Sequence, residues 1–156
     1  MKCKIFFIFL VLATLLTNIA FAAVPIITAD NQYFDVNSGL HVLSGNVRIE
    51  HKGRIITAGE AKTNLVEIWG SGGVTFTQGD LYFTGNTVYV YFPNHKAQIS
   101  DGVTLSYAEL KITADKVDFD WNSKIAAFSG NVNILQDGNS RSADTANYNV
   151  ITRLFE

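Results

Sequence analysis

The sequence contains almost no cysteine, and this excludes disulfide bonds as a source of stability. Of its 156 residues only Cys3 is a cysteine. Cys3 lies in an N-terminal segment that we expect to be removed, so the mature chain would contain none. Its stability therefore has to come from backbone hydrogen-bond ladders and side-chain packing.

Charged residues are also scarce. They make up 17% of the sequence, and the formal net charge at pH 7 is −2. No block of like charge occurs, so the sequence lacks the footprint of a nucleic-acid-binding protein, and we expect no nucleic-acid partner. Hydrophobic residues make up 47%, including 11 Phe, 6 Tyr and 2 Trp, which argues against a disordered chain.

The sequence offers no arrangement of residues for catalysis or metal binding. Its three histidines, His41, His51 and His95, fall at unrelated positions, and no cysteine or second histidine lies at ligand spacing. Asp118 and Asp120 are two residues apart on one predicted strand, so we expect them on a solvated face rather than in acid–base chemistry. We therefore expect no enzyme activity, no cofactor and no metal.

Residues 1–22 have the features of a secretory signal peptide. Two lysines precede an almost wholly apolar run at 5–16, and Ala20-Phe21-Ala22 supplies small residues for cleavage before Ala23. The alternative is an uncleaved anchor, because the 19 residues from Ile5 to Ala23 are just long enough to span a bilayer. We predict cleavage, since polar residues interrupt the run and the cleavage site follows at once.

Two short motifs recur in phase along the rest of the chain. The first, Ser-Gly-Asn-Val-x-apolar in its best copies, begins at Ser44, Ser71, Ser100 and Ser129. The second, apolar-Thr-small-Asp in its best copies, begins at Ile27, Ile56, Phe83 and Ile112. Self-similarity at a nearly fixed period indicates one structural unit used repeatedly, here about four and a half units of about 28 residues.

The segments between the turns have the composition of β-strands. Turn residues separate short runs that are rich in Val, Ile, Thr, Phe and Tyr, which is typical of an all-β sandwich or barrel. Within the runs, apolar and polar residues alternate, so each strand has one buried and one solvated face. The predicted inward residues are Phe34, Val36, Leu43, Val47, Ile49, Val74, Phe76, Val88, Val90, Phe92, Ile99, Val103, Leu105, Val117, Phe119, Trp121, Phe128, Val132 and Ile134.

The alternation changes phase near the aspartates of the second motif. Ile112 and Ala114 share one parity, whereas Val117 and Phe119 share the other. If all four face the interior, an extra residue must lie near Asp115, as in a β-bulge or corner. We expect two strands and a corner per unit, with the aspartates capping backbone groups there. Two facing antiparallel sheets would then enclose an apolar interior.

The first and last strands of such a stack have open edges. Unpaired backbone groups at an edge invite another chain to pair. The fifth unit, residues 141–156, lacks the second half of the repeat, and we predict that it pairs with the N-terminal edge of another copy or of a related protein. The alternative is a frayed tail. The predicted edge residues are Ile27, Tyr148, Val150, Leu154 and Phe155.

These motifs resemble the OstA-like family, and within it the LptA type of periplasmic lipopolysaccharide-transport bridge. The best copies are residues 27–49 and 112–134, and the resemblance extends over 27–155. It implies a twisted β-jellyroll, open along one side, formed by a single domain of residues 23–156. It also implies that an apolar groove carries the acyl chains of lipopolysaccharide.

The same resemblance implies partners. It predicts head-to-tail association with further copies, or with jellyroll components of the transport machinery at the inner and outer membranes. The second unit departs from the pattern, because it is two residues short and has Gly59 where other units have Asp or Asn.

Three functions stay open on the sequence alone. The first is a lipopolysaccharide carrier, the second is a membrane-anchored relative in the same pathway, and the third is a structural β-repeat scaffold that binds proteins through its edges. The interior is either a dry core or a groove that admits lipid, and only the resemblance favours the groove. Burying an acyl methylene gains about 0.8 kcal/mol, so a short length of chain suffices for useful affinity.

Overall fold

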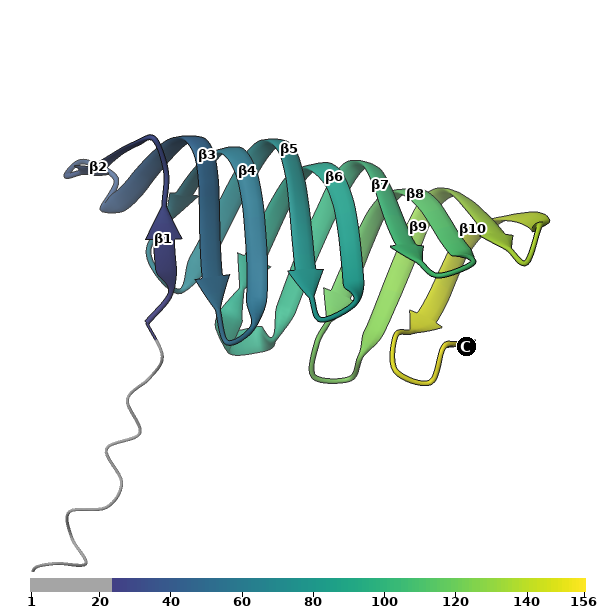
Figure 1. Ribbon diagram of the computed structural model, residues 1–156. Coiled ribbons are helices and arrows are strands. Elements are labelled where there is room, and N and C mark those ends of the chain that lie inside the picture. The colour runs from purple at the N-terminus through teal and green to yellow at the C-terminus, as the bar shows by residue number, and fades with distance from the viewer. Residues whose placement is uncertain (1–23) are drawn as a thin grey trace, which may run out of the picture.

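Residues 24–156 form an eleven-stranded antiparallel sheet in this computed structural model (Figure 1). The strands are β1 (Ile26–Thr28), β2 (Asn31–Asp35), β3 (Leu40–His51), β4 (Arg54–Thr63), β5 (Glu67–Gln78), β6 (Leu81–Tyr91), β7 (Lys96–Tyr107), β8 (Leu110–Asp120), β9 (Ile125–Gln136), β10 (Asn139–Asn149) and β11 (Leu154–Phe155). A short 3₁₀ turn, η1 (Phe92–Asn94), joins β6 to β7. The predicted signal peptide and its cleavage site lie outside the described residues.

The strands follow one another across the sheet in chain order. From β3 to β11 each strand pairs with the next, while both β1 and β2 pair with β3. The all-β prediction is therefore confirmed, although the strands form one continuous sheet rather than two. Within residues 24–156, no helix is long and apolar enough to cross a membrane.

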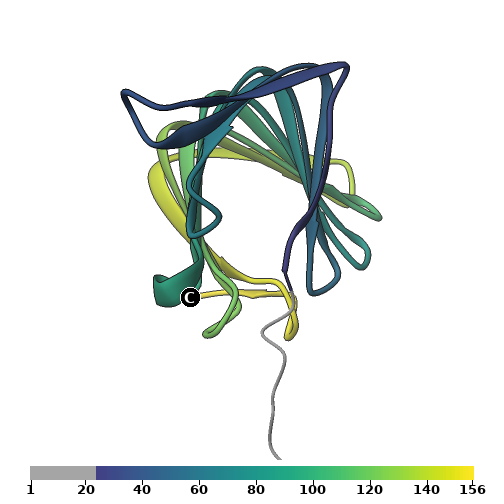
Figure 2. The same ribbon diagram turned by 90° about the vertical axis from the view of Figure 1, so that its left-hand side faces the viewer.

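Each long strand changes register near its middle. The predicted change of inward parity near Asp115 is confirmed, because Ala114 and Val117 are both buried. The extra residue lies on the neighbouring strand, since residues 114–115 of β8 oppose residues 130–132 of β9 in the register shift between Thr113 and Lys116. Equivalent shifts occur in every hairpin from β3 to β10. A bulge sharpens the local bend of a strand, so a row of bulges folds the whole sheet along one line. Figure 2 looks along the resulting roll and shows the strands curling around a common interior.

The two recurrent motifs meet at this line of bends. Gly130 and Asn131 have φ values of +75° and +48°, a left-handed conformation that glycine and asparagine tolerate best. Asn131 Nδ2 donates to Asp115 Oδ2 over 2.8 Å, and Asn46 makes the same contact with Asp30. The carboxylate lies directly over the glycine. The two aspartates therefore bind an asparagine side chain, and the prediction that they cap backbone groups is wrong for them.

Aromatic side chains from the two halves of the roll touch across its interior. Phe76 and Phe83 flank the β5–β6 turn, on one side of the line of bends, and Phe119 and Phe128 lie on the other side. The ring centroids are 5.8 Å apart for Phe76–Phe119 and 5.4 Å apart for Phe83–Phe119. All four side chains are at most 1% exposed. The middle of the roll is therefore a packed core in this structure.

Candidate functional site

Most of the residues predicted to face inward do line the interior. Each of the following is at most 3% exposed: Leu43, Val47, Ile49, Val74, Phe76, Val88, Val90, Ile99, Val103, Leu105, Val117, Phe119, Trp121, Phe128, Val132 and Ile134. They come from every strand from β3 to β9 except β4, and from the turn after β8. Within residues 24–156, Thr63 is the only buried polar residue. The interior is thus an apolar lining along the roll.

The inward placement is wrong for Phe34 and Val36. Phe34 is 53% exposed and Val36 is 80% exposed. Both belong to the β2–β3 hairpin at the N-terminal end of the roll, where no further strand covers them (Figure 1). Phe92 is partly buried, but it lies in η1 rather than in a strand, where it packs beside His51.

A further row of buried residues was left out of the predicted inward set, although the parity of Ile112 had indicated one of them. Ile56, Phe83 and Ile112 are at most 2% exposed and occupy the first position of the apolar-Thr-small-Asp motif. The same position in the first unit, Ile27, is partly buried against the core. The motif therefore marks an inward position ahead of each bend.

The predicted edge residues have different environments. Ile27 lies on terminal strand β1, opposite Ile49. Tyr148 is 3% exposed and packs on Phe155 at 5.1 Å, so it belongs to the interior instead of a free edge. Val150 and Phe155 are partly buried and Leu154 is 63% exposed. Strand β11 pairs with Tyr148 and Asn149 of β10, and the Glu156 N–H donates to the Asn147 carbonyl over 3.0 Å, which leaves the backbone of 139–146 open on that side.

The two rims of the folded sheet meet along one side of the roll, which we term the seam. One rim carries the β3–β4, β5–β6 and β7–β8 turns, and the other carries η1, the β8–β9 turn and residues 150–153. Aromatic contacts cross the seam between His51 and Phe92 at 4.6 Å, Arg54 and Trp121 at 4.6 Å, Arg153 and Tyr107 at 4.6 Å, and Arg141 and Phe155 at 4.4 Å. The seam is therefore held by side chains rather than by strand pairing.

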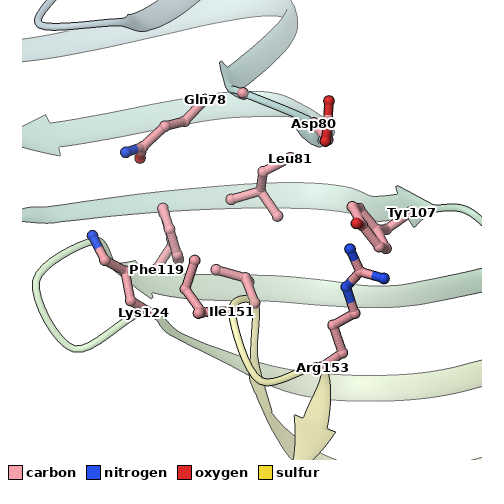
Figure 3. A pocket seen from close by; sticks show the side chains of 10 residues that line it. Gln78, Asp80, Leu81, Tyr107, Phe119, Lys124, Ile151 and Arg153 are labelled. Atoms are coloured by element: carbon pink, nitrogen blue, oxygen red, sulfur yellow. The ribbon is translucent and has the colours of Figure 1, made fainter.

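A cavity of about 400 Å³ opens at the seam, beside the Arg153–Tyr107 contact (Figure 3). Its apolar side is formed by Leu81, Phe119, Val150 and Ile151. Its polar lining is Gln78, Gly79, Asp80, Tyr107, Lys124 and Arg153. Because Phe119 also packs on the central rings, the floor of this cavity continues into the core.

Three cations lie along this part of the seam. The ion pairs among residues 24–156 are Arg48–Glu50 and Lys116–Asp118, so Arg54, Lys124 and Arg153 have no carboxylate within 4 Å. Lys124 Nζ donates to the Trp121 carbonyl, and the two arginines stack on aromatic rings. Burial lowers the pKa of Arg54, although arginine stays protonated at neutral pH.

Around Arg54 lies a group of buried polar atoms without hydrogen-bond partners. They are His51 Nδ1, Arg54 Nε and Gln78 Oε1. The three residues are direct neighbours in the sheet, since Arg54 pairs with His51 on β3 and with Gln78 on β5. Burial, then the charges of Lys52 and Arg54, lower the pKa of His51, which favours its neutral form.

The described residues contain no group of His, Cys, Asp and Glu that could hold a metal ion. What the geometry provides is a rolled antiparallel sheet of bent hairpins, with an apolar interior, a cationic seam and strand edges left open at both ends.

The chain belongs to the OstA-like family, because the model of OstA-like proteins matches residues 22–156. This confirms the resemblance seen in the motifs. Among solved structures, the chain is similar to LptH of Pseudomonas aeruginosa, described as the LptA-homologous periplasmic component of the conserved lipopolysaccharide transport device. The two share 12% identity over 85% of this chain and 80% of that chain, with a TM-score of 0.37. No curated protein matches the sequence significantly.

Proposed function

We propose that this protein is an LptA-type periplasmic carrier, which binds the acyl chains of lipopolysaccharide in its interior and passes the lipid from the inner toward the outer membrane. The observation that carries the proposal is the apolar lining, which extends from β3 to β9 without interruption. Membership of the OstA-like family supports it. The lining offers a long acyl chain a continuous path away from water.

Binding requires the packed interior to exchange one set of apolar contacts for another. An aromatic pair such as Phe76–Phe119 contributes about 0.5–1.5 kcal/mol beyond the burial of its surface. Each acyl methylene that enters gains about 0.8 kcal/mol. Two methylenes therefore offset one ring contact, provided that the lipid keeps the rings covered. Because only side chains hold the seam, it can open to admit the lipid while the backbone hydrogen bonds between strands stay intact.

Photocrosslinking in cells tests the carrier function. We expect p-azidophenylalanine in place of Phe119, which points inward, to form a lipopolysaccharide adduct. The same residue in place of Asp118, whose side chain is 48% exposed, should form none. For both variants, an immunoblot for lipopolysaccharide at the size of the protein shows whether an adduct has formed. Absence of an adduct at both positions, together with protein adducts near Tyr148 or Phe155, would instead favour the scaffold.

The open edges favour head-to-tail assembly, which we include in the proposal. Residues 139–146 of β10 have no strand paired on their outer side, and β1 and β2 form the opposite end of the sheet. An exposed strand edge accepts another strand through its free backbone groups. Pairing of β10 with β2 of the next copy would extend the apolar interior from one molecule to the next.

Because the predicted mature chain contains no cysteine, introduced cysteines can report this assembly. We expect the Gln32→Cys/Ser142→Cys double variant, treated with a short bismaleimide, to give a ladder of trimers and longer species on denaturing gels. Each single variant should stop at dimers. A matched pair on the outer face, Lys62→Cys/Asp118→Cys, controls for random collision. A ladder from the control alone, or none from either pair, would contradict head-to-tail pairing.

A further inference from the structure

We propose that the seam cavity is a binding site for the phosphorylated headgroup of a lipid. In this assignment Lys124 and Arg153, at the two ends of the cavity, and Arg54 beside it bind the phosphate groups of the head, while Leu81, Phe119 and Ile151 hold the first part of an acyl chain. The inference rests on the proposed carrier function, since it names the part of the ligand that the seam recognises.

The cavity has an apolar part and a charged part, as a phosphorylated lipid has an acyl chain and a charged head. Figure 3 shows Lys124 at one end and Arg153 below Tyr107 at the other, with Leu81, Phe119 and Ile151 between them. A chain that lies on the apolar residues would continue past Phe119 toward the core. Its charged head would stay at the rim, between the cations.

The charges of the site favour an anion. Lys124 and Arg153 line the cavity together with one carboxylate, that of Asp80, so the lining has a formal charge of +1 in a chain whose net charge is −2. Arg54 adds a further positive charge beside Gln78. Arg54 and Lys124 are partly buried, which strengthens their interaction with an anion relative to cations in open water.

The unpartnered polar atoms are complementary to such a ligand. A buried donor without a partner costs about 1–3 kcal/mol, and Arg54 Nε is such a donor. A phosphate oxygen would accept from it in a charge-assisted hydrogen bond. Gln78 Oε1 needs a donor instead, which a hydroxyl of a sugar carrying that phosphate would supply. The complementary class is therefore a phosphorylated glycolipid.

The seam contains its own fluorescent reporter. The chain has two tryptophans, of which Trp121 is 3% exposed beneath Arg54 and Trp69 lies on the outer face at 38% exposure. In the Trp69→Phe background, the emission of Trp121 reports events at the seam. The probes are bisphosphorylated lipid A, the same lipid after removal of its phosphates, and inorganic phosphate.

We expect the Trp69→Phe protein to bind the bisphosphorylated lipid about tenfold or more tightly than the dephosphorylated one, since one hydrogen bond to a charged group contributes about 1.5–3 kcal/mol. Lys124→Gln/Arg153→Gln should reduce this preference severalfold, and Arg54 supplies what remains. Asp80→Asn should increase it. Removing two cations from the outer face, Lys96→Gln/Lys111→Gln, should leave it unchanged. The variant pair removes the Arg153–Tyr107 contact but keeps the Arg54–Trp121 contact beside the reporter.

The outcomes separate the site from the function. Equal affinity for both lipids in the Trp69→Phe protein, or a preference that Lys124→Gln/Arg153→Gln leaves undiminished, would overturn the headgroup site and leave the carrier function standing. Failure to bind either lipid would overturn the carrier function itself. Inorganic phosphate that binds as tightly as the bisphosphorylated lipid would show a site for free phosphate and overturn the lipid assignment.

Discussion

Replacing Phe119 by alanine is expected to lower the free energy of unfolding by about 3–5 kcal/mol. The side chain is 1% exposed and contacts both Phe76 and Phe83 across the interior. Its removal leaves a cavity between the two halves of the roll, which the bent sheet cannot easily collapse to fill. Because small domains are stable by only about 5–15 kcal/mol, this is a large share of the total. Urea denaturation followed by circular dichroism measures it.

The neighbouring residue on the opposite face provides the control. Asp118 pairs with Lys116 at 2.7 Å and accepts a hydrogen bond from Gln98, all near the solvent. Exposed pairs of this kind contribute up to about 1 kcal/mol, so Asp118→Ala should change stability little. A loss below about 1 kcal/mol for Phe119→Ala would show that the rings do not pack together in solution. That result would favour an open groove over the packed interior.

The second large effect is expected at the bend, where Gly130→Ala should destabilise by about 2–4 kcal/mol. Part of this loss is the left-handed backbone at φ +75°, which costs a non-glycine residue about 1–2 kcal/mol. The rest is crowding, since a Cβ at Gly130 would lie 2.4 Å from Asp115 Oδ2. Overpacking of this kind typically costs about 1–3 kcal/mol. Thermal and urea unfolding both report the change.

Two comparisons separate the backbone cost from the crowding. Gly138 has φ +78°, but an alanine methyl there would meet no atom within 4 Å, so Gly138→Ala should show only the backbone cost. In the Asp115→Ala background, Gly130→Ala should cost less than it does in the parent chain, which a double-mutant cycle measures. Equal losses for Gly130→Ala and Gly138→Ala would mean that the carboxylate does not lie over the glycine.

The parts of the fold that depend on local pattern could be predicted from sequence. Alternation of apolar and polar residues is a property of neighbouring residues, so a short stretch of sequence suffices to predict that Val117 and Phe119 face inward. The parity change around Asp115 is equally local, and it located the bend, although the extra residue lies on the neighbouring strand. The role of Asp115 was misjudged because its partner, Asn131, lies 16 residues away, although both belong to recurrent motifs.

The burial of a residue by strands distant in sequence could not be predicted. Phe34 has the same alternation as the buried positions, but its burial would need another strand beyond the end of the roll. The seam is harder still. Lys124 and Arg153 occupy equivalent turns one repeat apart, each donating its backbone N–H to the residue four positions earlier. Arg54 begins β4 and has no such equivalence, and only the curling of the sheet places all three on one side of the roll.

The strand order also has a kinetic consequence. From β3 onward every strand pairs with the next strand in the chain, so each pairing closes a short loop. Such hairpins can form from any starting point and extend in both directions, unlike the distant pairings that slow the folding of many β-proteins. Phe83 and Phe119, in contrast, belong to strands β6 and β8 and meet only when the sheet bends. The ladder can therefore grow hairpin by hairpin, and curling of the finished ladder is the step expected to limit the rate.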